Sequence, residues 1–361
     1  MPTTPTVRPS VLALTAYVPG EQRPVPDLVK LNTNENPYPP SPQVAEAVAA
    51  VAQSDLRLYP DPECAALKSA LAEFYGLSPS QVFVGNGSDE VLAFSFLAFM
   101  DDDTPAVFPD ITYSFYPVYG KFFENHCRIV PVREDFTIPL EELMRDDGTV
   151  VLTNPNAPTG IFVELEDVRR LLERNPNHVV ILDEAYIDFG GESAVGLIPE
   201  YDNLLVIQTF SKSRSLAGMR AGYAMGNENL IAALTAVKDS MNSYTLDRMA
   251  LAAAQAAVED RAYFYDTCSA IAKTRENTAG KLKELGFLVL PSQANFLFAS
   301  HATVPARTLF RRLREEGVLV RYFDKPRIDN FLRITIGTDQ EMAILTDTLA
   351  QILKEEAHGG I

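Results

Sequence analysis

The segment Thr209-Phe-Ser-Lys-Ser-Arg-Ser-Leu-Ala-Gly-Met-Arg-Ala-Gly222 decides the fold. It follows the apolar run Leu204 to Gln208, which is typical of a buried strand. Lys212 comes just after this strand, among hydroxyl side chains and ahead of Arg220. Burial and nearby cations lower the pKa of a lysine held in such a place, which makes its amine a nucleophile for carbonyl groups. The segment therefore indicates either a Schiff-base lysine beside an anion site or a solvated lysine on a strand-to-helix loop.

The composition sets the broad class of the protein. The chain has 361 residues, of which 47% are hydrophobic and 22% charged, as expected of a soluble globular protein with about two domains. The net charge of −17 disfavours nucleic acid and anionic membranes as partners. The cysteines and histidines show no disulfide or metal-ligand spacing, so we expect free thiols, no metal and a cytoplasmic location. The longest apolar run, Val91 to Met100, is too short to cross a bilayer.

Short apolar strands alternate with helical segments from residue 67 to 225, which predicts an α/β domain with a mainly parallel sheet. An Ala-rich helical region from about 229 to 285 follows and includes a long run from Glu259 to Leu285. Gly286-Phe-Leu-Val-Leu290 then begins a second, smaller α/β unit. We expect residues 1–45 to form an arm and part of the small domain, 46–285 the large domain, and 286–361 the small domain.

A second polar segment, Gly85-Asn-Gly-Ser-Asp-Glu90, joins a short apolar strand directly to an apolar helix. The first N–H groups of a helix have no partner within the helix, and its dipole favours an anion there. Glycine lets the backbone approach such an anion closely. Gly87, Ser88 and Asp89 are therefore candidates to bind a phosphate, and the alternative is an ordinary Ser/Asp helix cap.

Three further strand ends carry polar or aromatic side chains. Tyr113 offers a ring face to a planar ligand, or it belongs to the core. Asn154 and Asn156 stand in a turn fixed by two prolines. Asp183 ends a very apolar strand and needs a partner such as a protonated ring nitrogen, and Tyr186 follows it. Ligands of parallel sheets lie beyond the carboxyl ends of the strands, so all these segments predict one site.

As an ordered set, these segments resemble the motifs of fold type I pyridoxal-phosphate aminotransferases, and within them those of the histidinol-phosphate group. The resemblance covers nearly the whole chain. It rests on Asn34-Glu-Asn-Pro37, Tyr59-Pro-Asp61, Gly87-Ser-Asp-Glu90, Asn154-Pro-Asn-Ala-Pro-Thr-Gly160, Asp183-Glu-Ala-Tyr186, Ser211-Lys212 with Arg220, and Leu332-Arg-Ile-Thr-Ile-Gly337. It implies a large domain with a mainly parallel sheet of the seven-stranded type and a smaller α/β domain. It also implies ping-pong transamination between L-histidinol phosphate and 2-oxoglutarate, a step of histidine biosynthesis.

The resemblance assigns roles to individual residues. Lys212 would form a Schiff base with pyridoxal phosphate and later move the proton, and Asp183 would keep the ring nitrogen protonated. Tyr186 would donate to the phenolic oxygen of the ring, and Tyr113 would stack on the ring. The phosphate would be surrounded by Gly87, Ser88, Asp89, Thr209, Ser211 and Arg220. Tyr59 would reach the cofactor of a second copy, which implies a homodimer.

The chain departs from the family at one position, because Ala157 stands where members often have an asparagine that bonds to the phenolic oxygen. We expect Asn154 or Asn156 to supply that bond. The substrate pocket must accept both a phosphate and carboxylates, and guanidinium groups suit both. The candidate substrate-binding residues are Tyr17, Asn34, Asn295, Arg321 and Arg333. The alternative for Arg321 is a surface salt bridge.

Other functions remain open on the sequence alone. An aromatic amino-acid aminotransferase would use the same scaffold, because phenylalanine also pairs a ring with an anion. A pyridoxal-phosphate-dependent decarboxylase of a phosphorylated amino acid would use the same ring chemistry. A non-catalytic binding or regulatory protein is a further alternative, which the presence of Lys212 and Asp183 disfavours.

Overall fold

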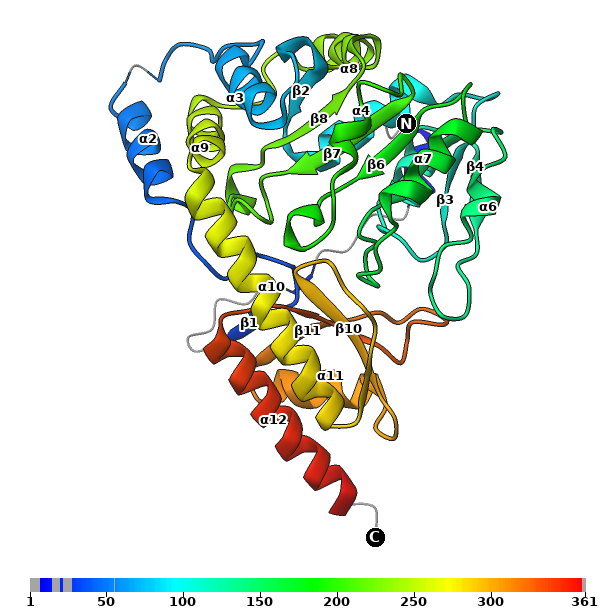
Figure 1. Cartoon of the computed structure of the whole chain (residues 1–361), viewed down its shortest axis with the longest axis vertical. Helices are drawn as coiled ribbons and strands as arrows, with labels where there is room; N and C mark the ends of the chain where they lie inside the picture. Colours follow the sequence, from blue (N-terminus) through cyan, green and yellow to red (C-terminus); the bar gives the residue numbers. More distant parts are fainter. Residues whose placement is uncertain (1–6, 15–19, 22–27, 55, 359–361) are drawn as a thin grey trace, which may run out of the picture.

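A computed structural model describes residues 7–14, 20–21, 28–54 and 56–358 of the protein. Its strands form a larger and a smaller sheet. The long helix α10 (Arg261–Glu284) runs from the larger to the smaller part and packs beside α12 (Asp339–His358), as Figure 1 shows. Among the helices of the described ranges, none combines the length and the apolar character needed to cross a membrane.

The larger sheet has seven strands in the order β2-β8-β7-β6-β5-β3-β4. Five neighbouring strands, from β7 to β4, are parallel, whereas β8 is antiparallel to both of its neighbours. The expected mainly parallel sheet is therefore confirmed. The strands are β2 (Val82–Gly85), β3 (Ala106–Pro109), β4 (Cys127–Val130), β5 (Thr149–Thr153), β6 (Val180–Asp183), β7 (Leu204–Thr209) and β8 (Gly222–Gly226).

Helices cover both faces of this sheet, which explains why its central strands are continuous apolar runs. Alternate residues of β7 enter different cores: Val206 packs in one cluster, and Leu205 and Ile207 pack in another. All six residues of β7 are buried. The helices of this part are α2 (Pro42–Ala52), α3 (Ala65–Tyr75), α4 (Gly87–Phe99), α5 (Tyr116–Phe122), α6 (Leu140–Leu143), α7 (Leu165–Arg174), α8 (Glu228–Met241) and α9 (Arg248–Glu259).

Local sequence signals set several helix ends. The Ser41 side chain accepts the N–H of Gln43 at 3.2 Å and Pro42 occupies the first turn of α2, which are both local signals for the start of a helix. Gly76 ends α3 with a φ of 71°, a conformation that glycine adopts without strain. Short turns of helix are α1 (Pro9–Leu12), η1 (Pro79–Gln81), η2 (Ile187–Phe189), η3 (Ala194–Leu197) and η4 (Ala217–Met219).

The smaller sheet has the strand order β1-β11-β12-β10-β9. Its first strand comes from the amino-terminal part of the chain and pairs in parallel with β11. The chain then passes from this sheet to α2 of the large part, which brings residues 32–41 between the two sheets. The elements are β1 (Val29–Leu31), β9 (Phe287–Val289), β10 (Phe296–His301), α11 (Ala306–Glu315), β11 (Val318–Tyr322) and β12 (Leu332–Thr335). The domain boundaries after residues 45 and 285 stay a prediction.

Gly222, the first residue of β8, allows this strand to lie against the start of α4. A Cβ atom at this position would stand 2.3 Å from the backbone nitrogen of Ser88 and 2.4 Å from the carbonyl carbon of Gly87. Both neighbouring atoms belong to the backbone, so a larger residue has to displace the chain.

Gly222→Ala is therefore expected to lower the free energy of unfolding by about 1–3 kcal/mol, the usual cost of overpacking. The matched control is Gly218→Ala, because no other atom lies within 4 Å of a Cβ at that glycine. Urea denaturation of the two variants measures the difference. Unchanged stability of Gly222→Ala would contradict the close approach of β8 to α4.

Candidate active site

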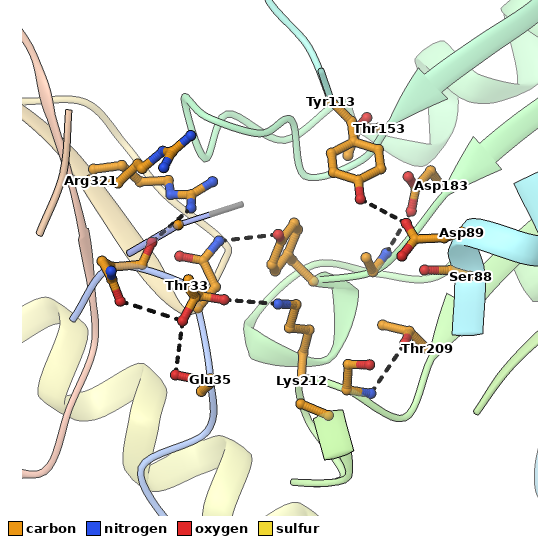
Figure 2. Close-up of a pocket in the computed structure, with 18 of the residues that line it drawn as sticks. Thr33, Glu35, Ser88, Asp89, Tyr113, Thr153, Asp183, Thr209, Lys212 and Arg321 are labelled. Carbon is orange, nitrogen blue, oxygen red and sulfur yellow. Dashed lines mark hydrogen bonds between the residues drawn. The ribbon is translucent and has the colours of Figure 1, made fainter. Parts of the chain in front are cut away.

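A cavity of about 240 Å³ lies at the carboxyl ends of β5, β6 and β7, where Thr153, Asp183 and Thr209 end the three strands (Figure 2). Residues of the smaller sheet and of the segment after β1 line its other side. The cavity therefore lies at the strand edge that the sequence predicts. The predicted residues that line it are Asn34, Ser88, Asp89, Tyr113, Asp183, Tyr186, Thr209, Ser211, Lys212, Arg220, Arg321 and Arg333.

Lys212 points into this cavity from the loop after β7, and its Nζ donates to the carbonyl oxygen of Thr33 at 3.1 Å (Figure 2). Burial lowers the pKa of the Lys212 amine to about 8, and the positive charge of Arg333 acts in the same direction. A substantial fraction of this amine is therefore neutral near pH 8, as a nucleophile for a carbonyl group requires.

Asp183 is a deeply buried carboxylate at the end of β6, with 3% of its surface exposed. Burial raises its pKa to about 6, although the hydroxyl of Tyr116 donates to Oδ2 at 2.9 Å and the N–H of Ala185 donates to Oδ1 at 3.2 Å. A cation placed beside this carboxylate would favour its charged form. Asp183 can thus hold a protonated ring nitrogen in the cavity.

The start of α4 and the loop after β7 bring together, on one wall of the cavity, groups that can bind an anion, here called the anion cradle. Gly87 and Ser88 lie in the first turn of α4, where N–H groups have no partner within the helix. The guanidinium of Arg220 donates to Ser211 Oγ at 3.4 Å and forms an ion pair with Asp89 at 3.2 Å. A Cβ on Gly87 would stand 2.8 Å from Nη2 of Arg220, so this glycine leaves room for the guanidinium. Hydroxyls, helix N–H groups and a guanidinium are the donors that suit a phosphate.

Two tyrosines border the space between the cradle and the lysine. The hydroxyl of Tyr113 donates to Asp89 Oδ1 at 2.7 Å (Figure 2). The hydroxyl of Tyr186 accepts a hydrogen bond from Nδ2 of Asn34 at 3.1 Å. Both tyrosines line the cavity.

Arg321 and Arg333 reach the cavity from the smaller sheet. They are register partners on the antiparallel strands β11 and β12. Their guanidinium carbons lie 5.5 and 5.6 Å from the ring centroid of Phe323. A second cavity of about 310 Å³ shares both arginines and Tyr113 with the first and is also lined by Ala157. The two cavities therefore adjoin at Arg321 and Arg333, which place two positive charges between them.

Four other predicted residues do not line the cavity, although one of them, Asn295, bonds to Asn34, which does. Asn154 bonds to both the N–H and the carbonyl of Val163, and Nδ2 of Asn156 donates to the carbonyl of Ile111 at 3.0 Å. Nδ2 of Asn295 donates to the carbonyl of Asn34 at 3.0 Å. The ring of Tyr59 is 78% exposed and stacks on Tyr244 with a centroid distance of 4.6 Å. The predicted ligand contacts of these residues stay predictions.

Tyr17 lies outside the described residues. Sequence reasoning did not single out Tyr116, which donates to Asp183, or Glu35, which lines the cavity. Burial opposes the charge on Glu35, but hydrogen bonds from Lys30 and Thr33 lower its pKa overall. The signal for Glu35 was present, because it stands inside the quoted motif Asn34-Glu-Asn-Pro37. For Tyr116 no such signal existed, because its contact depends on how α5 packs.

The groups that line this cavity fit pyridoxal phosphate. The anion cradle suits its phosphate, the buried Asp183 carboxylate suits its protonated ring nitrogen, and the Lys212 amine, with its lowered pKa, suits its carbonyl group. A metal centre has no comparable support. Across the described ranges no group of three or more His, Cys, Asp or Glu side chains is placed to hold a metal ion.

Comparison with known proteins agrees with this chemistry. Residues 26–349 match the family described as aminotransferase class I and II. The chain is 56% identical to a histidinol-phosphate aminotransferase of Acinetobacter baumannii (strain AB307-0294) over 95% of this chain and 96% of that protein. It is 53% identical to that of Clostridium acetobutylicum, over 95% and 97% of the two chains.

A solved structure gives the same result. The histidinol-phosphate aminotransferase of Sinorhizobium meliloti in complex with pyridoxal-5′-phosphate superposes with a TM-score of 0.87 at 25% identity, covering 98% of this chain and 99% of that one. The chain therefore belongs to the aminotransferase class I and II family and, within it, to the histidinol-phosphate aminotransferases.

Proposed function

We propose that this protein transfers an amino group between L-histidinol phosphate and 2-oxoglutarate, with pyridoxal phosphate as its cofactor. The observation that carries the proposal is the position of Lys212. Its amine faces a cavity that is lined by the anion cradle and by Arg321 and Arg333. The activity named for the relatives from Acinetobacter and Clostridium supports it.

Pyridoxal phosphate, when bound, supplies a ring that withdraws electrons from the substrate carbon. The start of α4, Ser211 and Arg220 would hold its phosphate, and Asp183 would hold the proton on its ring nitrogen. Nζ of Lys212 would bind the cofactor carbonyl and, once displaced by the substrate amine, would take up and return the proton. Tyr186 would donate to the phenolic oxygen.

Substrate recognition depends on Arg321 and Arg333. One substrate has a phosphate and the other has carboxylates, and a guanidinium binds either through two parallel hydrogen bonds. Both arginines lie at the junction of the two cavities, so the second cavity gives the distal part of a substrate a place to lie.

We also propose a homodimer located in the cytoplasm. Four large apolar side chains are exposed, and Tyr59 stacks on Tyr244, which supports burial of this region against a second copy. They are Leu58, Tyr59, Met241 and Tyr244, with exposed fractions of 51%, 78%, 61% and 43%. The three cysteines are free thiols, which is usual in a reducing compartment. Sedimentation of the native protein at the monomer mass of 39.8 kDa would contradict the dimer.

The proposed substrate is tested by a single-turnover experiment. Histidinol phosphate, or separately phenylalanine, is mixed with the cofactor-loaded protein, and the cofactor absorbance is followed. We expect histidinol phosphate to convert the cofactor to its amine form faster, by about tenfold or more, because its phosphate makes charge-assisted bonds that phenylalanine lacks. Equal or faster conversion with phenylalanine would instead assign the protein to aromatic amino-acid transamination.

The lowered pKa of Lys212 predicts how pH controls cofactor capture. Only the neutral amine attacks a carbonyl, so the rate at which the cofactor-free protein binds pyridoxal phosphate should rise with pH and level off above about pH 8. Arg333→Met removes a cation that disfavours the protonated amine, so the midpoint should move to higher pH.

The matched control is Arg311→Met, because the Arg311 side chain is 69% exposed on α11. It should leave the midpoint unchanged. A wild-type midpoint near the 10.5 of an ordinary lysine, or the same midpoint in the Arg333 variant, would show that burial and Arg333 do not act on this amine.

A further inference from the structure

Asn34 is a buried asparagine between the two sheets, with 1% of its surface exposed and a φ of 56°. Its backbone N–H donates to Thr335 Oγ1 at 3.0 Å, and its carbonyl accepts from Asn295 at 3.0 Å. Its side-chain Oδ1 lies 3.0 Å from the same Thr335 oxygen, and its Nδ2 lies 3.1 Å from the hydroxyl of Tyr186. Asn34 thus connects β12 of the smaller sheet to the wall of the cavity.

Three hydrogen bonds link Thr335, Asn34 and Tyr186 in a series, and the direction of each one is set by the bond before it. The backbone N–H of Asn34 can only donate, so the Thr335 oxygen accepts. The single hydroxyl proton of Thr335 is then given to Oδ1 of Asn34. This fixes the amide so that its NH2 group, which can only donate, faces Tyr186. The Tyr186 oxygen therefore accepts in this bond, and its own proton points away from Asn34.

The same segment also contacts the lysine. The residue before Asn34 is Thr33, and its carbonyl oxygen accepts from Nζ of Lys212 at 3.1 Å. That Nζ stands 5.8 Å from the centroid of the Tyr186 ring. Ala157, which has no polar side chain, packs in the same buried cluster as Tyr186. The direction of the Tyr186 proton therefore matters more here than where an asparagine occupies position 157.

We propose that Thr335 is a positioning residue that acts through Asn34 to direct the hydroxyl proton of Tyr186 into the cavity, toward the phenolic oxygen of the cofactor. This inference rests on the proposed function, because it requires pyridoxal phosphate in the cavity. Both residues stand in motifs quoted above, but neither their contact nor the direction of the hydrogen bonds follows from the motifs, since Thr335 and Asn34 are 301 positions apart in the chain.

The test is a pH titration of the visible absorbance of the cofactor-loaded protein. A proton donated by Tyr186 stabilises negative charge on the phenolic oxygen, so its loss should raise the titration midpoint. Thr335→Val removes the hydroxyl with little change in shape. The Asn34 amide can then turn its oxygen toward Tyr186 and take that proton. We expect a rise of about one pH unit, the size of one hydrogen bond to a charged group.

Thr335→Ser is the matched control, because it keeps the hydroxyl and should retain the wild-type midpoint. Tyr186→Phe should itself raise the midpoint, and adding Thr335→Val to it should cause no further shift. A Thr335→Val midpoint equal to wild type, or a full further shift in the double variant, would overturn the positioning role. If Thr335→Val fails to fold, Thr335→Ala takes its place with the same expected rise.

The titration separates the two proposals. A protein that develops no visible band with pyridoxal phosphate contradicts the proposed function. A protein that binds the cofactor but titrates identically with Thr335 and with Val at that position contradicts only the role of Thr335.

Discussion

The removal of the Lys212 amine from water is the constraint on which the site depends. Burial lowers the pKa of this amine from 10.5 to about 8, so keeping it protonated in the fold costs about 3 kcal/mol. Because the pKa is lower in the folded state, this cost is absent above the unfolded pKa of 10.5. It grows as the pH falls from 10.5 to about 8 and is complete below the folded pKa. The carbonyl of Thr33 offsets part of the desolvation by accepting from Nζ. The fold thus holds a buried amine with a lowered pKa, which is the form suited to attack a carbonyl group.

Two sheets are needed to build that environment. The larger sheet brings Asp183 and the lysine loop to one edge, and the close approach of β8 to α4 places the anion cradle beside them. The smaller sheet closes the opposite side with Arg321 and Arg333. The crossing segment after β1 contacts both, because Asn34 bonds to Thr335 on one side and to Tyr186 on the other. Relative movement of the sheets would therefore change the contacts of the reactive groups directly.

The strand-end residues could be predicted from the sequence because their signals are local. A long apolar run ending in Asp183, or one followed by Lys212, specifies both the strand and the place of the side chain. Pro42 in the first turn of α2 and Gly76 after α3 are similarly local signals of helix ends. The bonding partners of side chains could not be predicted in this way. Asn154 and Asn156 stand in the expected turn, yet their Nδ2 groups donate to the backbone, and only tertiary packing decides that direction.

The most direct test of this account is the identity of the residue that binds the cofactor. Borohydride fixes the bond between pyridoxal phosphate and its lysine, and mass spectrometry of the peptides then locates the modified residue. The account predicts one modified lysine per chain, at Lys212. Modification at another lysine, such as Lys30 or Lys325, or no stable modification, would contradict the assignment of the cavity and of the chemistry derived from it.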